Sequence, residues 1–357
     1  MLRTSRQVRS LQPLPVGPEP AGRRREAPPP EPEPLPAGLA AGLGLGLDVE
    51  PAGDADQDPR QGEAVYRQLV QVAEHVYAAS ECSRPLDEAT VIAGLRQALA
   101  ALRVDDALLS ETVRQRQESR SWPQRAANTA VLAMRLGAEL EYDERRLLAL
   151  GLCALMHDVG MLRVPREILD GGRLTPEQLQ VLKRHPLDSQ EIVNGFGAGF
   201  EWAAKIVVQV HERYDGSGYP AGLRDGEVHE MARIIGVADT YEAMAHPRAD
   251  REARVTYHAL KEIIDLRNTL YERRVIKALI QIVSIFPLGS LVKLNNGEIG
   301  RVIATSRTHP TRPVVEVLID SRQQRLSPPR RLDLQDEPML YIVDPAIDEG
   351  VLGSPGA

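Results

Sequence analysis

The sequence predicts a mainly α protein with a small C-terminal β unit and a disordered, proline-rich N-terminal arm. Three observations support this prediction. Apolar residues recur at helical spacing from about residue 63 to residue 285. After Pro287, apolar and polar residues alternate as in β-strands. Residues 1–60 hold 12 of the 27 prolines and no aromatic residue, so they cannot bury enough apolar surface to offset the entropy lost on ordering.

Length, charge and cysteine content limit the classes of protein that this chain can be. A chain of 357 residues is long enough for two or three units, each with its own core. The net charge of −7 argues against a nucleic-acid partner, which a strong basic excess would indicate. Cys82 and Cys153 lie in apolar helical contexts and are expected to be reduced core residues. No apolar run is long enough to span a membrane, and we expect a cytoplasmic protein without a membrane partner.

Residues 62–118 are predicted to form a small helical unit without recognisable chemistry. The apolar residues of its first helix fall on one face: Val65, Leu69, Val72 and Val76. A second helix is expected to begin at a cap formed by Asp87, and a third near Asp105. The sequence does not distinguish a sensory role for this unit from a packing role.

Residues 119–285 continue the helical pattern and contain the polar residues of interest. The helix over residues 145–156 is apolar on nearly all sides and ends in His157-Asp158, so two polar groups enter a buried region. His185 follows at a helix junction. His211 is expected on a helix over residues 202–213, and Asp239 on another buried helix.

Residues 287–345 are predicted to form the small β unit, and residues 346–357 a flexible tail. Asn295-Asn-Gly297 is a hairpin turn signal between alternating segments, and Val314–Ile319 continues the β pattern. The last strand is expected near residues 341–343. No catalytic constellation occurs here, which favours a structural or docking module.

The polar residues of the helical region indicate metal chemistry when they are taken together. An isolated histidine on an apolar face is more often a core residue, and an aspartate at a helix end is often a cap. Here His157 and Asp158 offer a nitrogen and a carboxylate from one helix end, and a carboxylate can bridge two ions. His211 adds a ligand beside a glycine-rich loop, residues 215–220, that is open to substrate. The pattern predicts metal-assisted hydrolysis of a phosphoester.

The chain resembles the HD-GYP family over about residues 120–285. The resemblance is carried, in chain order, by His157-Asp158-Val-Gly160, His185-Pro186, His211-Glu212, Gly218-Tyr219-Pro220 and Asp239. It implies an HD-type helical bundle that hydrolyses cyclic di-GMP at a site of two or three divalent metal ions, often iron or manganese. The metal ligands that it implies are His157, Asp158, His185, His211 and Asp239.

The resemblance also implies the roles of individual residues. Asp158 and His157 would be the catalytic pair, with Asp158 bridging the ions. Arg248 and Arg251 would bind substrate phosphate, and the loop Gly218-Tyr219-Pro220 would lie against the substrate.

Several positions depart from the family pattern. Arg125 stands where an upstream histidine ligand is usual, and Val210 stands where the first of two adjacent histidines is usual. Met161 replaces a lysine, and Asp250 replaces a tyrosine between the two phosphate-binding arginines. An arginine cannot lose its proton to become a ligand. We therefore expect weak metal binding and reduced activity.

Three functions fit this sequence. The first is a cyclic di-GMP phosphodiesterase of bacterial second-messenger signalling with reduced activity. The second is a catalytically silent protein of the same fold that binds a nucleotide or a signalling protein such as a cyclase. The third is a phosphohydrolase for another nucleotide. The sequence leaves open whether the protein forms a homodimer.

Overall fold

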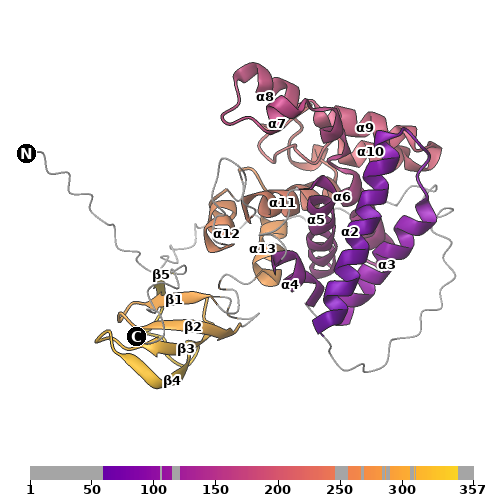
Figure 1. Cartoon of the computed structure of the whole chain (residues 1–357). Coiled ribbons are helices and arrows are strands. Elements are labelled where there is room, and N and C mark those ends of the chain that lie inside the picture. Colours follow the sequence, from indigo (N-terminus) through magenta and orange to yellow (C-terminus); the bar gives the residue numbers. More distant parts are fainter. Residues whose placement is uncertain are drawn as a thin grey trace, which may run out of the picture.

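The described residues between Pro59 and Ile282 are mainly helical, and strands follow in the C-terminal part (Figure 1). The computed structural model describes residues 59–104, 107–114, 121–245, 256–266, 269–283, 286, 290–305, 309 and 311–344. The predicted arm, apart from its last two residues, and the predicted C-terminal tail lie outside the described residues. The helix α2 begins at Pro59, four residues before the expected start of helical periodicity.

The helical region comprises α-helices and short 3₁₀ helices. The α-helices are α2 (Pro59–Glu81), α3 (Glu88–Val104), α4 (Ala107–Arg114), α5 (Trp122–Glu139), α6 (Glu144–Met156), α7 (Arg166–Leu169), α8 (Pro176–Leu182), α9 (His185–Gly195), α10 (Glu201–Val207), α11 (Glu230–Ala245), α12 (Thr256–Asp265) and α13 (Arg273–Ile282). Short 3₁₀ helices are η2 (Val159–Arg163), η3 (Ala198–Phe200) and η4 (Asp225–Glu227). The cap predicted at Asp87 is confirmed, since its Oδ1 accepts from the backbone N–H of Thr90 at 3.3 Å.

The core of the helical region is built around α5 and α6. Every residue from 126 to 137 of α5 and from 147 to 156 of α6 is buried. A helix that is buried all round must be enclosed by others, and α2, α3, α11 and α13 pack on this pair (Figure 1). Since α2 and α4 pack directly on α5, residues 62–118 share the core of the following helices. The domain boundary at residue 118 stays a prediction.

The helix expected over residues 202–213 ends earlier, and this prediction was wrong at its C-terminal end. The helix α10 ends at Val207, and tighter turns follow, in which the N–H of Gln209 donates to the carbonyl of Ile206. Further turns of this kind follow, because the N–H groups of Val210 and Glu212 donate to the carbonyls of Val207 and Gln209, three residues back. His211 therefore lies in a turn.

The strands form a five-stranded antiparallel sheet in the order β4-β3-β2-β1-β5. They are β1 (Leu291–Leu294), β2 (Ile299–Ala304), β3 (Val314–Ile319), β4 (Arg325–Asp333) and β5 (Ile342–Asp344). The predicted hairpin turn is confirmed, because Gly297 has a φ of 90° and its N–H donates to the carbonyl of Leu294. The sequence did not indicate β4, which contains Pro328 and Pro329; an edge strand tolerates proline because it leaves one side unpaired.

The structure bears on the expectations about the two cysteines and about membrane-spanning helices. Cys153 is buried as expected, whereas Cys82 is exposed because it follows the last residue of α2 in a turn; both are free thiols. Among the described residues, none of the helices combines the length and apolarity that crossing a membrane requires.

Candidate metal centre

His157 and Asp158 stand where the buried helix α6 ends. His157 is the residue that caps this helix, and its Nδ1 lies 2.8 Å from the carbonyl oxygen of Ala154. Its other ring nitrogen, Nε2, lies 3.5 Å from Oδ2 of Asp158 and 3.6 Å from Oδ1 of Asp239. Both distances exceed an ordinary hydrogen bond, and within the described part of the chain this buried Nε2 has no hydrogen-bond partner.

His185 and His211 meet the other oxygen of the same carboxylate. Nε2 of His185 lies 3.1 Å from Oδ1 of Asp158, and Nε2 of His211 lies 3.4 Å from it. The two Nε2 atoms are only 2.9 Å apart. Nδ1 of His185 is anchored at 2.7 Å to the carbonyl of Leu182. The structure thus brings all five predicted ligands together around Asp158, although they come from four separate segments.

Close packing of η2 against α9 places His185 beside Asp158. A Cβ atom at Gly160 would overlap the carbonyl oxygen of His185, so glycine allows the two backbones to approach. The N–H of Gly160 donates to Oγ of Ser189 at 2.9 Å, and this serine is fully buried. The contact fixes the start of α9 and directs His185 toward the carboxylate.

The loop after His211 folds back over the imidazole. The N–H of Tyr219 donates to the carbonyl of His211, and the two rings stack with their centroids 5.1 Å apart and their planes 4° from parallel. The loop is held by Glu212, whose carboxylate accepts from three consecutive backbone N–H groups, those of residues 221, 222 and 223, at 2.7 to 3.1 Å. A Cβ at Gly218 would overlap the backbone of Glu212 and Arg213, so only glycine fits there.

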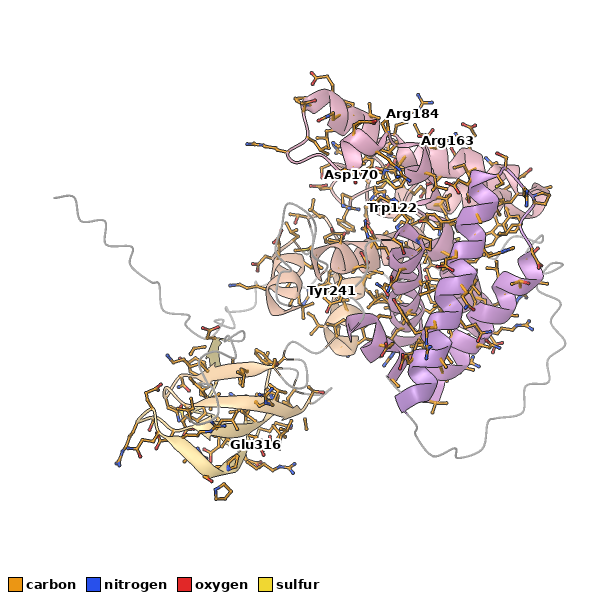
Figure 2. All side chains as sticks on the ribbon, viewed as in Figure 1. Trp122, Arg163, Asp170, Arg184, Tyr241 and Glu316 are labelled. Carbon is orange, nitrogen blue, oxygen red and sulfur yellow. The ribbon has the colours of Figure 1, made fainter. Side chains whose placement is uncertain are left out.

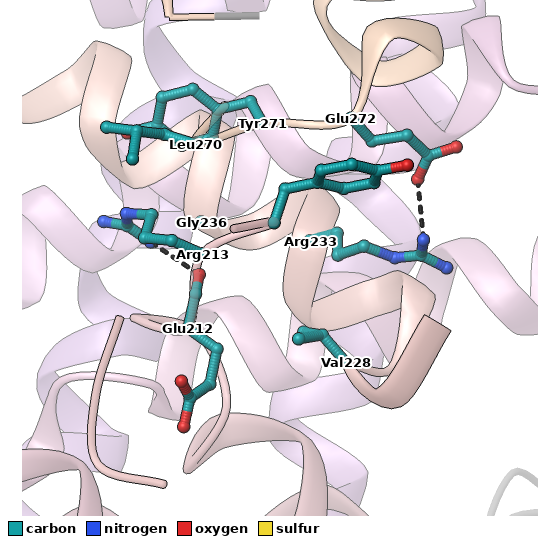
Figure 3. Close-up of a pocket in the computed structure, with 9 residues that line it drawn as sticks. Glu212, Arg213, Val228, Arg233, Gly236, Leu270, Tyr271 and Glu272 are labelled. Carbon is teal, nitrogen blue, oxygen red and sulfur yellow. Dashed lines mark hydrogen bonds and ion pairs between the residues drawn. The ribbon is translucent and has the colours of Figure 1, made fainter. Parts of the chain in front are cut away.

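Next to this loop, the pocket between residues 212–214 and residues 270–272 is packed too tightly for a ligand (Figure 3). Arg213 lies over the ring of Tyr271, with its guanidinium carbon 5.3 Å from the ring centroid, and Arg233 pairs with Glu272 at 3.0 Å. The cavity between them has a volume of about 10 Å³, near the least that holds one water molecule. The pocket supports the loop and does not add a second binding site.

Arg125 places a fixed positive charge beside these acidic groups. Its Nε lies 3.2 Å from Oε2 of Glu242, which is fully buried on α11 one turn after Asp239. Its guanidinium carbon lies 4.9 Å from the ring of Trp122, which Figure 2 labels at the start of α5. Burial alone would lower the pKa of Arg125, but Glu242, Asp239 and Asp158 more than offset this and raise it. Arg125 therefore faces the carboxylates and is not turned to solvent, as expected for the histidine position that it replaces.

The charges of the cluster shift one another's pKa values. Burial opposes the charged form of His157, but the carboxylates of Asp158 and Asp239 outweigh it and raise its pKa to about 9. Burial would also raise the pKa of both carboxyl groups, yet the histidines lower it in each, with His157 the main partner. For His211 burial dominates and the pKa is lowered, whereas hydrogen bonding and attraction to Asp158 raise that of His185. Without a metal, a proton on His157 offsets part of the carboxylate charge.

Two residues near the centre were not identified from the sequence. Lys183, at the end of α8, has its ammonium nitrogen 5.4 Å from the centroid of Tyr219. Tyr77 comes from α2, and its pKa is raised well above the usual value, chiefly by burial and then by the nearby Asp158. Tyr77 gives no motif of its own, and only its place on the buried face of α2 could have singled it out.

The donor set suits a metal ion. Two groups of side chains each bring their ligand atoms within 4.8 Å of one another, namely Asp158 with His185 and His211, and Asp158 with His157 and Asp239. Where Nδ1 is anchored to a carbonyl, Nε2 is left as the ligand atom. Two Nε2 atoms at 2.9 Å beside a carboxylate need a proton or a metal cation between them. The five side chains form two clusters that could hold metal ions and that share one carboxylate.

Comparison with known proteins identifies the family. Residues 105–275 match the HD domain family, and residues 291–351 match the KOW domain associated with HD domains. The cyclic di-GMP phosphodiesterase PA4108 of Pseudomonas aeruginosa is 28% identical over 236 residues, covering 66% of this chain and 56% of that protein. The 3'3'-cGAMP-specific phosphodiesterase 1 of Vibrio cholerae is 36% identical over 132 residues, covering 36% of this chain and 30% of that protein. The HD domain match and these relatives support assignment of the helical region to the HD-GYP family.

A solved structure shares the fold. Bd1817, an HDG"Y"P protein from Bdellovibrio bacteriovorus, superposes with a TM-score of 0.52 and 17% identity over 68% of this chain and 75% of that one. The chain spans about half the length of the curated relatives first matched, 56% of one and 51% of the next. The HD-type helical bundle expected from the sequence is confirmed.

The departures from the HD-GYP pattern can now be placed. Val210 is buried in the hydrophobic core beside His211, so core packing fills the place of the first of the two adjacent histidines. Met161 is buried in η2. Arg248, Asp250 and Arg251 lie outside the described residues, so their predicted roles at the phosphate stay predictions.

Proposed function

We propose that this HD-GYP protein is a metal-dependent phosphodiesterase that hydrolyses cyclic di-GMP, with activity reduced by its missing ligands. The observation that carries the proposal is the carboxylate of Asp158, whose two oxygens face two different sets of ligands. A shared carboxylate is what a site of two metal ions requires. Relatives with the same domain are named as phosphodiesterases of cyclic dinucleotides, which supports this substrate class.

The residues divide into two sides of the centre. His157 and Asp239 would hold one ion with Asp158, and His185 and His211 would hold the other. Iron or manganese suits such a mixture of imidazole and carboxylate ligands. Bound metal would lower the pKa of a water molecule and withdraw charge from the phosphoryl group. Because the described residues bring five candidate ligands together, we expect weaker metal binding than in relatives with a full set.

The substrate would approach over the loop of Tyr219. This ring stacks on His211, and the ammonium nitrogen of Lys183 lies over it, 5.4 Å from the ring centroid, where it adds a positive charge at the loop. A cyclic dinucleotide carries two phosphodiester groups, so one can lie at the metals while a cation at the rim attracts the other. Arg248 and Arg251 are proposed to add to this charge.

The test is a hydrolysis assay on protein loaded with iron or manganese, together with elemental analysis of its metal content. We expect bound metal and slow loss of cyclic di-GMP in the wild type, and neither in Asp158→Asn. The asparagine keeps the size of the side chain but lacks the charge that both clusters share. Absence of metal from wild-type protein after loading would contradict the proposal.

One observation favours a catalytically silent protein as the second candidate. The guanidinium of Arg125 already pairs with Glu242 beside Asp239 and thus supplies positive charge that a metal would otherwise bring. A silent protein would bind cyclic di-GMP, or a signalling protein such as a cyclase, without turnover. Loss of 3'3'-cGAMP but not of cyclic di-GMP in the same assay would instead indicate a different nucleotide substrate.

A further inference from the structure

Tyr77 is a buried polar residue whose hydroxyl group is not used by the fold. Only 4% of this side chain is exposed. Within the described part of the chain, its hydroxyl oxygen is buried and has no hydrogen-bond partner. A buried hydroxyl without a partner costs free energy, so a protein rarely keeps one without a use. Its helix, α2, lies outside residues 105–275, which match the HD domain family.

The surroundings of Tyr77 connect it to the metal centre. The helix α2 packs against α5, which carries Arg125, and against η2, which directly follows Asp158. The charged groups that act on the Tyr77 hydroxyl are Asp158, Asp239 and Glu242, with Arg125 acting in the opposite sense. These are the carboxylates of the candidate centre and the ion pair beside it. The buried hydroxyl thus lies on a helix that packs against the centre and within electrostatic reach of its carboxylates, but donates to none of them.

Tyr66 on the same helix shows the contrasting case. It is also buried, with 2% exposed, and its hydroxyl donates to Oδ1 of Asn128 on α5 at 2.8 Å. The helix α2 therefore places two tyrosines in the interior. Tyr66 has a partner on α5, whereas Tyr77 has none among the described residues and lies within electrostatic reach of the acidic cluster.

We propose that the Tyr77 hydroxyl donates a hydrogen bond to an anionic oxygen held at the metal centre, either of a substrate phosphate or of metal-bound solvent. Both sources present the same chemistry, which is a negatively charged oxygen that accepts from a neutral donor. This inference rests on the proposed function, since it needs metal to bring an anion into an acidic site. It also gives the N-terminal helix a direct part in binding.

The test compares Tyr77→Phe with Tyr66→Phe in the full chain. Thermal unfolding is measured without metal, and affinities are then measured for Mn²⁺ alone and for inorganic phosphate at saturating Mn²⁺. Tyr77→Phe should keep or raise the unfolding temperature, because it removes an unsatisfied group, and should weaken binding by about 10- to 100-fold. Weaker Mn²⁺ binding would identify metal-bound solvent as the acceptor, and weaker phosphate binding alone would identify the substrate phosphate.

Tyr66→Phe is the matched control, because it removes the same atom from the same helix. It should lower the unfolding temperature and leave both affinities unchanged. The inference is overturned, with the proposed function intact, if wild type and Tyr77→Phe bind Mn²⁺ and phosphate equally. It is also overturned if Tyr77→Phe destabilises the metal-free protein as much as Tyr66→Phe. Failure of the wild type to bind Mn²⁺ would overturn both proposals.

Discussion

Replacement of Arg125 by histidine tests whether this arginine stands in for a metal ion. The variant Arg125→His restores a ligand type but removes the partner of Glu242, which is fully buried. Breaking a buried ion pair by removing one partner costs about 3–5 kcal/mol. The arginine side chain is only 19% exposed, so solvent screens the pair little. For a region of this size, that loss corresponds to an unfolding temperature lower by about 6–20 °C.

The assay is thermal unfolding in EDTA and then in excess Mn²⁺. In EDTA we expect the full loss for Arg125→His and a partial recovery when Glu242→Gln is added, because the amide removes the buried charge. In Mn²⁺ the variant should recover more stability than the wild type gains, since the ion supplies the missing positive charge and binding stabilises the folded state. Arg103→His is the control, because Arg103 and Glu144 form a surface pair 2.9 Å apart, and exposed pairs contribute little.

Two results would refute this reasoning. An unfolding temperature for Arg125→His in EDTA equal to that of the wild type would show that the pair does not stabilise the fold. An equal response of both proteins to Mn²⁺ would show that Arg125 does not oppose a metal. Restored stability without hydrolysis of cyclic di-GMP would place the remaining defect at the phosphate site.

Three other predictions follow from the site. Because the pKa of His157 is raised to about 9, its charge stabilises the metal-free protein fully below about pH 6.5, and this stability is lost as pH rises through 9. Metal must displace that proton, so Mn²⁺ affinity measured by titration should rise about tenfold per pH unit between pH 7 and 9; a flat profile would exclude a protonated His157. Lys183→Met should raise the KM for cyclic di-GMP while Arg184→Met, whose side chain is 71% exposed, should not; equal effects would exclude a specific role for Lys183. Glu212→Gln should increase hydrogen exchange at backbone amides 221–223, because a neutral amide accepts more weakly than a carboxylate, and unchanged exchange would show that the loop is held by other contacts.

The sequence by itself was sufficient to predict the helical region and the types of residue that could act as metal ligands. The apolar run that ends at His157-Asp158 requires a buried helix with polar groups at its end, whatever the rest of the fold. The glycine-rich loop that contains Gly218-Tyr219-Pro220 could likewise be predicted from the local sequence alone. The hairpin at Gly297 also follows from local chemistry, because a turn of that kind needs a residue that accepts positive φ.

Other features depend on contacts between distant segments. Sequence could not show that Tyr77 lies beside the carboxylates, because its position depends on how α2 packs against α5 and η2. Arg125 pairs with Glu242, 117 positions away in the sequence. The sequence showed Arg125 only as the replacement of a ligand, whereas the structure shows it as the partner of a buried acid.

The end of α10 and the strand β4 also depended on tertiary structure. Local propensity favours a longer helix, but after Val207 the N–H groups of residues 209, 210 and 212 pair with carbonyls three residues back, in tighter turns. The two prolines of β4 argue against a strand until its place at the sheet edge is known. Local sequence thus determined which residues could bind metal and where the main helices run. Tertiary packing decided which charges and hydroxyls surround the candidate metal ligands, because low solvent access makes those neighbours control the charge at the centre.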